Sequence, residues 1–317
     1  IHLLEAGHVL AVKGLGGFHL MCDARSDAAV GRLRERKRRT SKPFAVMVRN
    51  IEAAHRLAVL SEAEAALLAS PARPIVIAPK ASGYDLSDDV APGLADVGLL
   101  LPYTPLHSLL VDAGMPLVAT SGNLSEEPLC FTNADALARL SRLADVFLLH
   151  DRDIAGPVED SVYLGTTPTR RSRGYAPLPV VLSSTRPTVL AVGGELKNTF
   201  ALAKDDFAHL SAHCGDMGTL PSVQAFEASV HQLLRMRRAR PDVVVCDLHP
   251  GYATTTWAER YAETTGIPLI RVQHHHAHAL ALLAEHRWPL DQPIAVAALD
   301  GTGYGTDATI WGGEVLL

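Results

Sequence analysis

The sequence predicts a mixed α/β fold divided into two domains. Short apolar runs typical of strands alternate along the chain with longer segments that repeat apolar residues at helical spacing. The chain has 317 residues, and domains commonly hold ~150, so two domains are expected. A stretch rich in proline and serine at 176–187 is the best candidate for a linker. We therefore expect one domain at residues 1–180 and a second at 188–317.

The composition limits the classes of protein to which the chain can belong and indicates where in the cell it is expected. The chain is 48% hydrophobic and 20% charged, which is typical of a globular protein with real cores. The formal net charge of −5 indicates no general affinity for nucleic acid or anionic lipid, and no apolar run has transmembrane length. The four cysteines lie far apart and form no Cys-x-x-Cys pair. We expect buried free thiols in the reducing cytoplasm.

The first domain is expected to hold a twisted sheet covered by helices. Apolar and β-branched runs predict the strands, and a glycine-rich turn at 14–17 joins the first two. The segments between these runs fit helices. The strands are expected at 9–13, 18–22, 44–48, 74–78, 116–120, 146–150 and 161–164. The helices are expected at 26–39, 51–58, 61–69, 104–113 and 133–142.

The second domain begins with a different order of elements. Three consecutive strands are expected at 188–192, 199–204 and 207–211. Helices at 223–239, 253–264 and 274–286 then alternate with strands at 243–246 and 269–272. This order is that of the first lobe of an actin-like ATPase, which is a ribonuclease-H-like fold. A second lobe would begin with a strand at 294–299 and a hairpin at 307–315, so we expect this chain to be truncated there.

A cluster of histidines near the end of the chain predicts a metal site. His274 and His278 are four residues apart, so on a helix both imidazoles lie on one face, one turn apart. Asp300 ends an apolar run and leads into a glycine-rich turn. Two nitrogens and one carboxylate form the ligand set of a catalytic metal site, and either iron or zinc would suit it. His275 and His276 point elsewhere, so they either support the ligands or are ordinary polar positions.

A basic run in the first domain predicts phosphate binding. Lys37 and Arg39 lie near the end of the predicted helix, and Lys42 follows three residues later. An isolated run of this kind is more often a solvated helix face. Here it leads into a strand, where the three cations could converge on a triphosphate.

Three shorter motifs are compatible with anion binding. The turn at 119–125 contains Ser121 and Asn123, and the run at 170–175 contains Arg171 and Arg173. Gly193 and Gly194 lie in the first predicted hairpin of the second domain, where actin-like folds hold phosphate. Each motif has a simpler alternative. The segment at 119–125 could be a plain turn, and the arginine run could be a solvated strand edge. The Gly193-Gly194 pair could be a simple β-turn.

These motifs, in this order, resemble known families. The Lys37–Arg39 and Ser121–Asn123 motifs resemble the pairs that hold ATP in the YrdC/Sua family. Essentially the whole chain is similar to the HypF family of carbamoyltransferases, through motifs at 12–24, 42–47, 101–107, 171–177, 191–198, 247–252, 273–278 and 300–305.

The HypF resemblance implies a two-step reaction in the maturation of [NiFe]-hydrogenase. Carbamoyl phosphate and ATP, with Mg²⁺, would yield carbamoyl adenylate in the first domain. The carbamoyl group would then pass to the C-terminal cysteine of the partner HypE, where later dehydration supplies cyanide ligands. The implied catalytic residues are Lys37, Arg39 and Lys42, and the implied ATP or adenylate contacts are Lys13, Ser121, Asn123, Arg152, Arg171 and Arg173. The implied phosphate loop is Gly193-Gly194, and the implied metal ligands are His274, His278 and Asp300.

The chain departs from the family pattern in three respects. The family's acylphosphatase-like domain and its Cys-x-x-Cys zinc fingers are absent, so this piece should not process carbamoyl phosphate itself. A further metal-ligating aspartate is expected beyond Leu317. The loop at 150–157 has no basic residue after Arg152, which puts one substrate contact in doubt.

Three other functions remain open. One is an O-carbamoyltransferase of secondary metabolism, although that group carries the two modules in the opposite order. Another is a threonylcarbamoyl-adenylate enzyme of tRNA modification, which would need a threonine pocket. The third is a non-enzymatic RNA-binding module that uses the face of 32–39. The overall acidity and the 5% aromatic content count against the third, because single-strand binders need stacking platforms.

Overall fold

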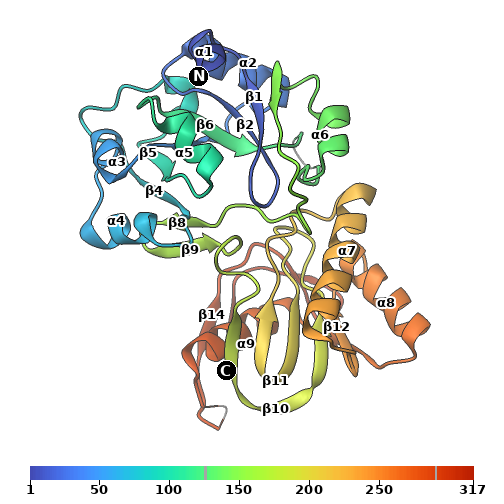
Figure 1. Cartoon of the computed structure of the whole chain (residues 1–317). Helices are drawn as coiled ribbons and strands as arrows, with labels where there is room; N and C mark the ends of the chain where they lie inside the picture. The colour runs from blue at the N-terminus through green and yellow to red at the C-terminus, as the bar shows by residue number, and fades with distance from the viewer. Residues whose placement is uncertain (125–126, 290) are drawn as a thin grey trace. The chain divides into compact units, whose positions relative to one another are not determined.

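The chain divides into two compact units, Ile1–Tyr175 and Ala176–Leu317 (Figure 1). The computed structural model describes residues 1–124, 127–289 and 291–317, and at 183–186 it describes the backbone alone. Ser125, in the predicted anion-binding turn, lies outside the described residues.

The first unit is built on one mixed sheet. Its strands are β1 (Leu10–Lys13), β2 (Phe18–Asp23), β3 (Ala45–Met47), β4 (Ile75–Pro79), β5 (Asp96–Leu100), β6 (Leu117–Ser121), β7 (Val146–Leu148), β8 (Val162–Leu164) and β9 (Thr167–Arg170). Within the described residues, these nine strands follow the order β7-β1-β2-β6-β3-β5-β4-β8-β9. Strand β6 lies between β2 and β3, and its last residue, Ser121, pairs with His19 of β2. The predicted anion-binding turn therefore starts in the middle of the sheet.

Except for the first, which follows Ile1, the helices of the first unit begin at polar capping residues. They are α1 (His2–Glu5), α2 (Asp27–Lys37), α3 (Ile51–Leu57), α4 (Glu62–Ala69), α5 (Pro105–Val111) and α6 (Asn133–Arg139), with a 3₁₀ turn η1 at Asp88–Val90. The side chains of Ser26, Asn50, Ser61, Thr104 and Thr132 each accept a hydrogen bond from the first turn of the helix that follows. Such caps satisfy backbone donors that have no partner inside the helix, so they fix where each helix starts.

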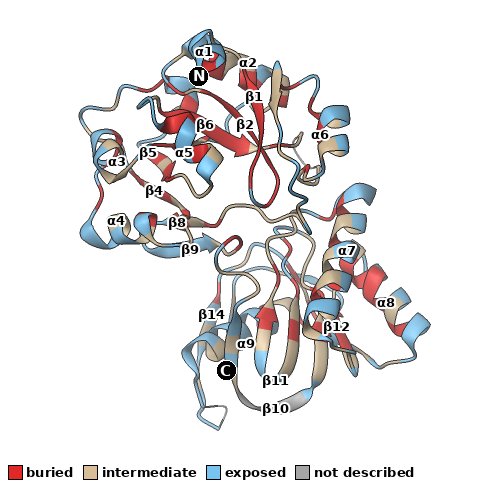
Figure 2. Ribbon diagram, in the orientation of Figure 1, coloured by how far each residue is buried: buried red, intermediate tan, exposed pale blue. Residues whose placement is uncertain are grey.

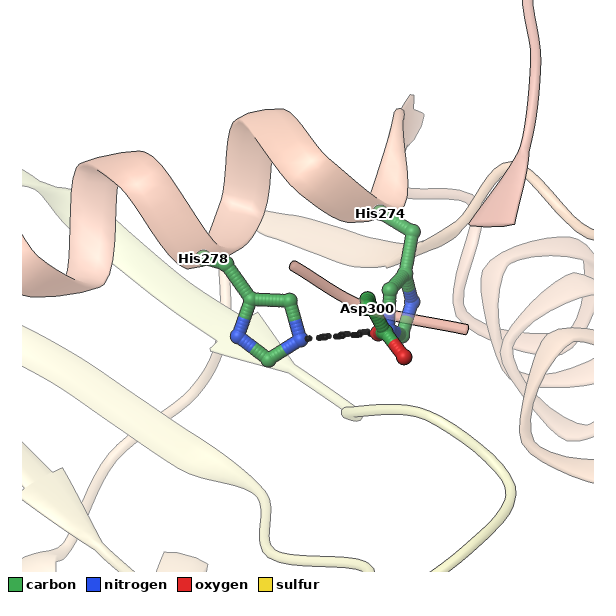
Figure 3. A group of neighbouring side chains, drawn as sticks. All are labelled: His274, His278 and Asp300. Carbon is green, nitrogen blue, oxygen red and sulfur yellow. Dashed lines mark hydrogen bonds and ion pairs between the residues drawn. The ribbon is translucent and has the colours of Figure 1, made fainter. Parts of the chain in front are cut away.

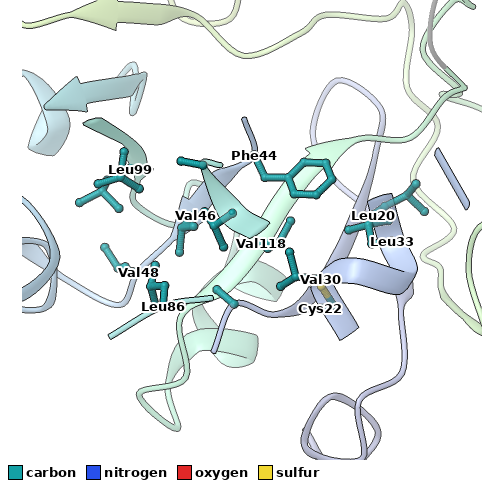
Figure 4. Close-up of a cluster of buried hydrophobic side chains, with 14 of the residues drawn as sticks. Leu20, Cys22, Val30, Leu33, Phe44, Val46, Val48, Leu86, Leu99 and Val118 are labelled. Carbon is teal, nitrogen blue, oxygen red and sulfur yellow. The ribbon is translucent and has the colours of Figure 1, made fainter. Parts of the chain in front are cut away.

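The sheet of the first unit buries both of its faces. Alternate residues of β2 and β6 point in opposite directions, so Leu20 and Val118 join one core while Met21 and Leu117 join the other. Helix α2 covers the first face through Val30 and its neighbours (Figure 4), and α5 contributes to the second. Figure 2 shows buried residues along β1, β2 and β6 of this sheet. A sheet covered on both faces gives the turn after β6 a rigid base.

The second unit combines a small sheet with three helices. Its main strands are β10 (Pro179–Ala191), β11 (Ala201–Leu210), β12 (Val243–Asp247) and β13 (Leu269–Val272), and its helices are α7 (Leu220–Arg237), α8 (Ala253–Thr265) and α9 (His274–His286). In the described part of the unit, the sheet order is β11-β10-β12-β13. Strands β10, β12 and β13 run parallel, so the ends of β12 and β13 reach the same edge. An aromatic core of Phe200, Phe226 and Trp257, packed edge to face, joins α7 and α8 to the sheet.

The mixed α/β class is confirmed, but several predicted elements differ. The stretch expected as a linker lies mostly in β10, which begins at Pro179. Three strands were expected from 188 to 211, whereas β11 continues through Asp205 without a turn. Strands β5 and β9 were not predicted. The expected hairpin at 307–315 is divided, because β16 (Ile310–Trp311) pairs with β15 (Gly303–Tyr304) and β17 (Glu314–Leu316) pairs with β14 (Val296–Ala298).

None of the helices in the described ranges combines the length and the apolar character that a membrane crossing requires.

Candidate functional site

The first candidate site forms where helix α2 ends. The helix stops at Lys37 because Arg38 adopts the left-handed conformation, with a φ of 52°. The Lys37 side chain is 1% exposed, and its ammonium donates to the carbonyl oxygens of Ser121 at 2.7 Å and Asn123 at 2.6 Å. It also lies 3.3 Å from the side-chain oxygen of Asn123. Two predicted motifs that are 84 residues apart in sequence therefore meet.

The turn after β6 is held by its own side chains. The Ser121 hydroxyl donates to Asn123 Oδ1 at 2.7 Å, and Asn123 Nδ2 donates to the carbonyl of Glu127 at 2.7 Å. The Gly122 amide donates to the carbonyl of Phe18 at 2.7 Å. A Cβ atom at Gly122 would lie 2.7 Å from the Cβ of Phe18, so only glycine allows this approach. The turn is preorganised before any ligand binds.

Arg39 adds a second cation next to Lys37, and it contacts β6 through Thr120. Its Nη1 donates to the Thr120 hydroxyl at 3.0 Å, and its Nε donates to the carbonyl of Lys42 at 3.0 Å. Its guanidinium carbon lies 4.9 Å from the centre of the Phe44 ring, and that of Arg34 lies 4.6 Å from it. Arg34 also donates to the carbonyls of Arg39 and Lys42, so it braces this loop. The sequence pattern did not distinguish Arg34 from the rest of the basic run.

Burial and mutual repulsion lower the pKa values of these cations. Burial, followed by the charge of Arg39, lowers the pKa of Lys37 to about 7. Burial, followed by the charge of Arg34, lowers the pKa of Arg39 to about 10. Glu159 opposes both shifts and forms an ion pair with Arg170. A polyanion bound beside this cluster would relieve the repulsion, which is a physical reason to expect phosphate here.

The other predicted ATP contacts have different environments. Lys13 is 2% exposed and donates to the carbonyl of His150 at 3.1 Å. Lys42 is exposed, and its backbone carbonyl accepts a hydrogen bond from Arg39 Nε. Arg152 is exposed in the loop between β7 and β8, and partial burial lowers the pKa of Arg171. Their part in ATP binding stays a prediction.

Arg173 belongs to a buried polar network. Its Nε donates to Asp160 at 2.8 Å, and its terminal nitrogens donate to the carbonyls of Ala72 and Arg73 at 2.7 and 2.9 Å. Its guanidinium carbon lies 3.5 Å from the centre of the Tyr103 ring. These contacts give Arg173 a structural role that its place in an arginine-rich run did not indicate. A direct contact with ATP stays a prediction.

Gly193 and Gly194 form a tight turn in the second unit. Gly193 has a φ of 74°, and a Cβ there would lie 2.2 Å from the carbonyl oxygen of Thr199, so this position requires glycine. Asn198 donates to the carbonyls of Val192 at 2.9 Å and Gly194 at 2.7 Å, which braces the turn. A Cβ built at Gly194 would lie 3.7 Å from the His274 ring. The predicted phosphate loop therefore lies beside the predicted metal ligands.

The three predicted metal ligands lie together in the second unit. His274 and His278 extend from one face of α9, and Asp300 follows β14 (Figure 3). Asp300 Oδ2 lies 2.9 Å from His274 Nε2 and 3.4 Å from His278 Nε2, and the two nitrogens are 3.2 Å apart. One candidate ligand atom from each of the three residues lies within 4.8 Å of the others. Two nitrogens and an oxygen that converge in this way fit zinc or iron.

The loop that carries Asp300 is fastened to the start of α9. A Cβ at Gly303 would lie 2.3 Å from the His275 ring, so the backbone packs directly on this buried imidazole. Gln273 Nε2 donates to the carbonyl of Tyr304 at 3.3 Å, and Gln273 Oε1 caps α9 by accepting from the His276 amide at 2.9 Å. His275 therefore supports the loop that carries the predicted ligand Asp300, whereas His276 is an exposed position.

Asp247, at the end of β12, was not among the predicted site residues. His274 Nδ1 donates to Asp247 Oδ2 at 2.6 Å. This hydrogen bond is the largest cause of the raised pKa of His274, and the charges of Asp247 and Asp300 add to it. Burial raises the pKa of Asp300, but the Gly301 amide and His274 outweigh it and leave the value lowered. An acidic residue at a strand end was the sequence signal that could have identified Asp247.

Comparison with protein families covers nearly the whole chain. The Sua5/YciO/YrdC profile, described as "Telomere recombination", matches residues 2–172. The profile for the "HypF Kae1-like domain" matches residues 184–285. A third, described as "Carbamoyltransferase, Kae1-like Domain, second subdomain", matches residues 296–317.

Curated relatives extend well beyond this chain. The carbamoyltransferase HypF of Synechocystis sp. is 46% identical over 319 residues, which cover 99% of this chain and 41% of that protein. The probable carbamoyltransferase HypF of Methanocaldococcus jannaschii is 40% identical over 324 residues, or 100% of this chain and 42% of that protein. The chain thus spans less than half the length of these relatives.

Solved structures show the same arrangement within each unit. A full-length HypF in a phosphate- and nucleotide-bound form matches with a TM-score of 0.93 and 42% identity, over 99% of this chain and 50% of that one. HypF of T. kodakarensis matches with a TM-score of 0.93 and 37% identity, over 99% of this chain and 42% of that one. Sua5 of P. abyssi, at 17% identity and a TM-score of 0.51 over 86% of this chain and 94% of that one, shows a shared fold alone.

Proposed function

The chain belongs to the HypF family, whose curated members are carbamoyltransferases, and on this premise we propose that it carries an ATP-dependent carbamoyl transfer. In this proposal the first unit forms carbamoyl adenylate from ATP and carbamate, which derives from carbamoyl phosphate. The second unit passes the carbamoyl group to the C-terminal cysteine of HypE. The product serves cyanide-ligand synthesis during maturation of [NiFe]-hydrogenase.

The contact between two predicted motifs is the strongest support for this function. The end of α2 and the turn after β6 meet through the Lys37 ammonium, which bonds directly to Ser121 and Asn123. A cluster of cations beside a preorganised hydroxyl and amide suits a triphosphate. The relative that shares 42% identity with this chain is described in a phosphate- and nucleotide-bound form, which supports ATP as the ligand.

The first step needs charge stabilisation rather than a nucleophilic side chain. A carbamate oxygen attacks the α-phosphorus of ATP, and the bond to the bridging oxygen breaks so that pyrophosphate leaves. Lys37, Arg39 and Lys42, with Mg²⁺, stabilise the negative charge that develops on the phosphorus and on pyrophosphate. Ser121 and Asn123 orient the phosphate or the carbamate through hydrogen bonds. Lys13, Arg152, Arg171 and Arg173 are the further contacts of this proposed site.

The second step transfers the carbamoyl group to sulfur. The cysteine thiolate of HypE attacks the carbamoyl carbon, the carbon–oxygen bond to AMP breaks, and AMP leaves. His274, His278 and Asp300 would hold one transition metal, which when bound supplies Lewis-acid chemistry. Gly193 and Gly194 would present backbone amides to phosphate beside that group. A cytoplasmic location is part of the same proposal.

Carbamoylation of HypE by the full-length protein that carries these residues tests the proposal. With ATP and carbamoyl phosphate, we expect the C-terminal peptide of HypE to gain one carbamoyl group, detected by mass spectrometry. His278→Ala should reduce the initial rate at least tenfold, because it removes one metal ligand. His276→Ala is the matched control, since His276 is an exposed position on the same helix. A His278→Ala variant as active as the control would contradict the role of the second unit.

A further inference from the structure

We propose that Asp247 is a positioning residue for His274 in the proposed metal site. Asp247 accepts a hydrogen bond from Nδ1 of His274, which leaves Nε2 as the atom that binds the metal. The inference rests on the proposed metal site at His274, His278 and Asp300. It assigns a role to a carboxylate that lies outside the three candidate ligands.

The sheet places Asp247 where this role is possible. Strands β12 and β13 run parallel, and Asp247 pairs with Val272 at the end of the register. The chain leaves β13 at Val272, and Gln273 caps α9, so His274 comes two residues after the partner of Asp247. The carboxylate and the first imidazole of the helix therefore meet at the same edge of the sheet.

Both oxygens of Asp247 already have protein partners. Oδ2 accepts from His274 Nδ1 at 2.6 Å, and Oδ1 accepts from the backbone amide of His249 at 2.8 Å. The Asp247 side chain is 7% exposed, whereas that of Asp300 is 35% exposed. A carboxylate anchored and buried in this way suits support of a ligand better than direct metal binding.

The contact determines which nitrogen of His274 faces the metal group. An ionised carboxylate only accepts hydrogen bonds, so Nδ1 must carry the proton. In a neutral imidazole the other nitrogen, Nε2, then keeps its lone pair. Nε2 is the atom that lies 2.9 Å from Asp300 Oδ2 and 3.2 Å from His278 Nε2. Carboxylate partners of this kind orient metal-ligating histidines and make them more basic.

Metal titration of the purified 317-residue chain tests the proposal. Zn²⁺ is the probe, and its affinity is measured by competition with a chromophoric chelator. Asp247→Ala should weaken Zn²⁺ binding by about 10- to 100-fold, the usual effect of removing such a partner. Asp242→Asn is the matched control, because Asp242 lies just before the same strand and caps the Thr188 amide instead. The control should bind Zn²⁺ within twofold of the unchanged chain.

Nitrogen-detected NMR of the unchanged chain loaded with Zn²⁺ gives a second readout. His274 should carry its proton on Nδ1 and bind Zn²⁺ through Nε2. Binding of Zn²⁺ through Nδ1 of His274 in the unchanged chain, or Zn²⁺ affinity in Asp247→Ala equal to the control, would overturn the proposal.

The failure of this inference can be distinguished from failure of the metal site. If His274→Ala and His278→Ala lose Zn²⁺ binding while Asp247→Ala keeps it, the site stands and the positioning role is wrong. If all three variants bind Zn²⁺ like the unchanged chain, the metal site itself is wrong. Weaker binding in all three, with His274 of the Zn²⁺-loaded unchanged chain protonated on Nδ1, supports both.

Discussion

At the scale of single residues, the protonation of Lys37 should make ATP binding at the proposed site depend on pH. Burial, followed by the charge of Arg39, makes the ammonium unfavourable and lowers its pKa to about 7. Hydrogen bonds to the carbonyl oxygens of Ser121 and Asn123 offset part of this cost. Bound phosphate would favour the charged form again, so ATP binding and protonation of Lys37 should be coupled.

We therefore predict that ATP affinity falls as the pH rises above about 7. In that range the free protein has largely lost the Lys37 charge, so binding must take up a proton. The affinity should decrease by up to ~10-fold per pH unit. Calorimetric titration with MgATP between about pH 7.5 and 9 measures this, because the terminal phosphate, whose pKa is ≈ 6, is already ionised there. Lys37→Met, of similar length, should bind weakly at every pH, and the same slope in this variant would contradict the coupling.

The residue types at the two sites could be predicted more fully than their roles. Charge and spacing were enough to select Lys37 and the His274–His278 pair, because those patterns are local. They could not show how Arg34 and Arg173 are held, because some of their partners are backbone carbonyls far away in the sequence, such as that of Val90 for Arg34 and that of Ala72 for Arg173. Asp247 was missed for the same reason, since its contact with His274 depends on the pairing of β12 with β13.

At the scale of elements, local signals predicted some bounds and failed at others. Helix α9 has the predicted bounds, because Gln273 caps its start and Arg287, in the left-handed conformation, ends it. Strands β10 and β11 were divided wrongly, because the Pro/Ser-rich stretch and the Asp205-Asp206 pair have turn-like composition. Their long antiparallel pairing carries the strands through these residues, and no local pattern contains that information.

The attachment of the Asp300 loop to α9 predicts a selective effect of Gly303→Ala. The added methyl carbon would overlap the His275 ring at 2.3 Å, so the loop must move away from the helix. We expect Zn²⁺ affinity to fall at least tenfold although all three ligands remain. Gly301→Ala is the control, because a Cβ there meets no atom within 4 Å. Equal Zn²⁺ affinities in the two variants, measured by chelator competition, would show that the loop contact does not position Asp300.

At the scale of the whole molecule, each unit has a hydrophobic core of its own. In the first unit, apolar side chains cover both faces of the sheet. In the second unit, they pack α7 and α8 on the sheet that contains β12, whose last residue is Asp247. Alternating apolar runs predicted this mixed α/β class, because burial of one or both sheet faces leaves a periodic pattern in the sequence. The proposed chemistry divides in the same way, with adenylation in one unit and transfer in the other.

In the proposed function, the first unit couples ATP cleavage to carbamate. The most direct measurement is exchange of radioactive pyrophosphate into ATP by the purified chain, with ammonium carbamate supplied directly so that carbamoyl phosphate need not be processed. We predict exchange that requires carbamate and that falls to background in Lys37→Ala, while circular dichroism shows the fold retained. Exchange that proceeds without carbamate, or that is undiminished in Lys37→Ala, would show that the first unit does not couple ATP cleavage to carbamate through Lys37.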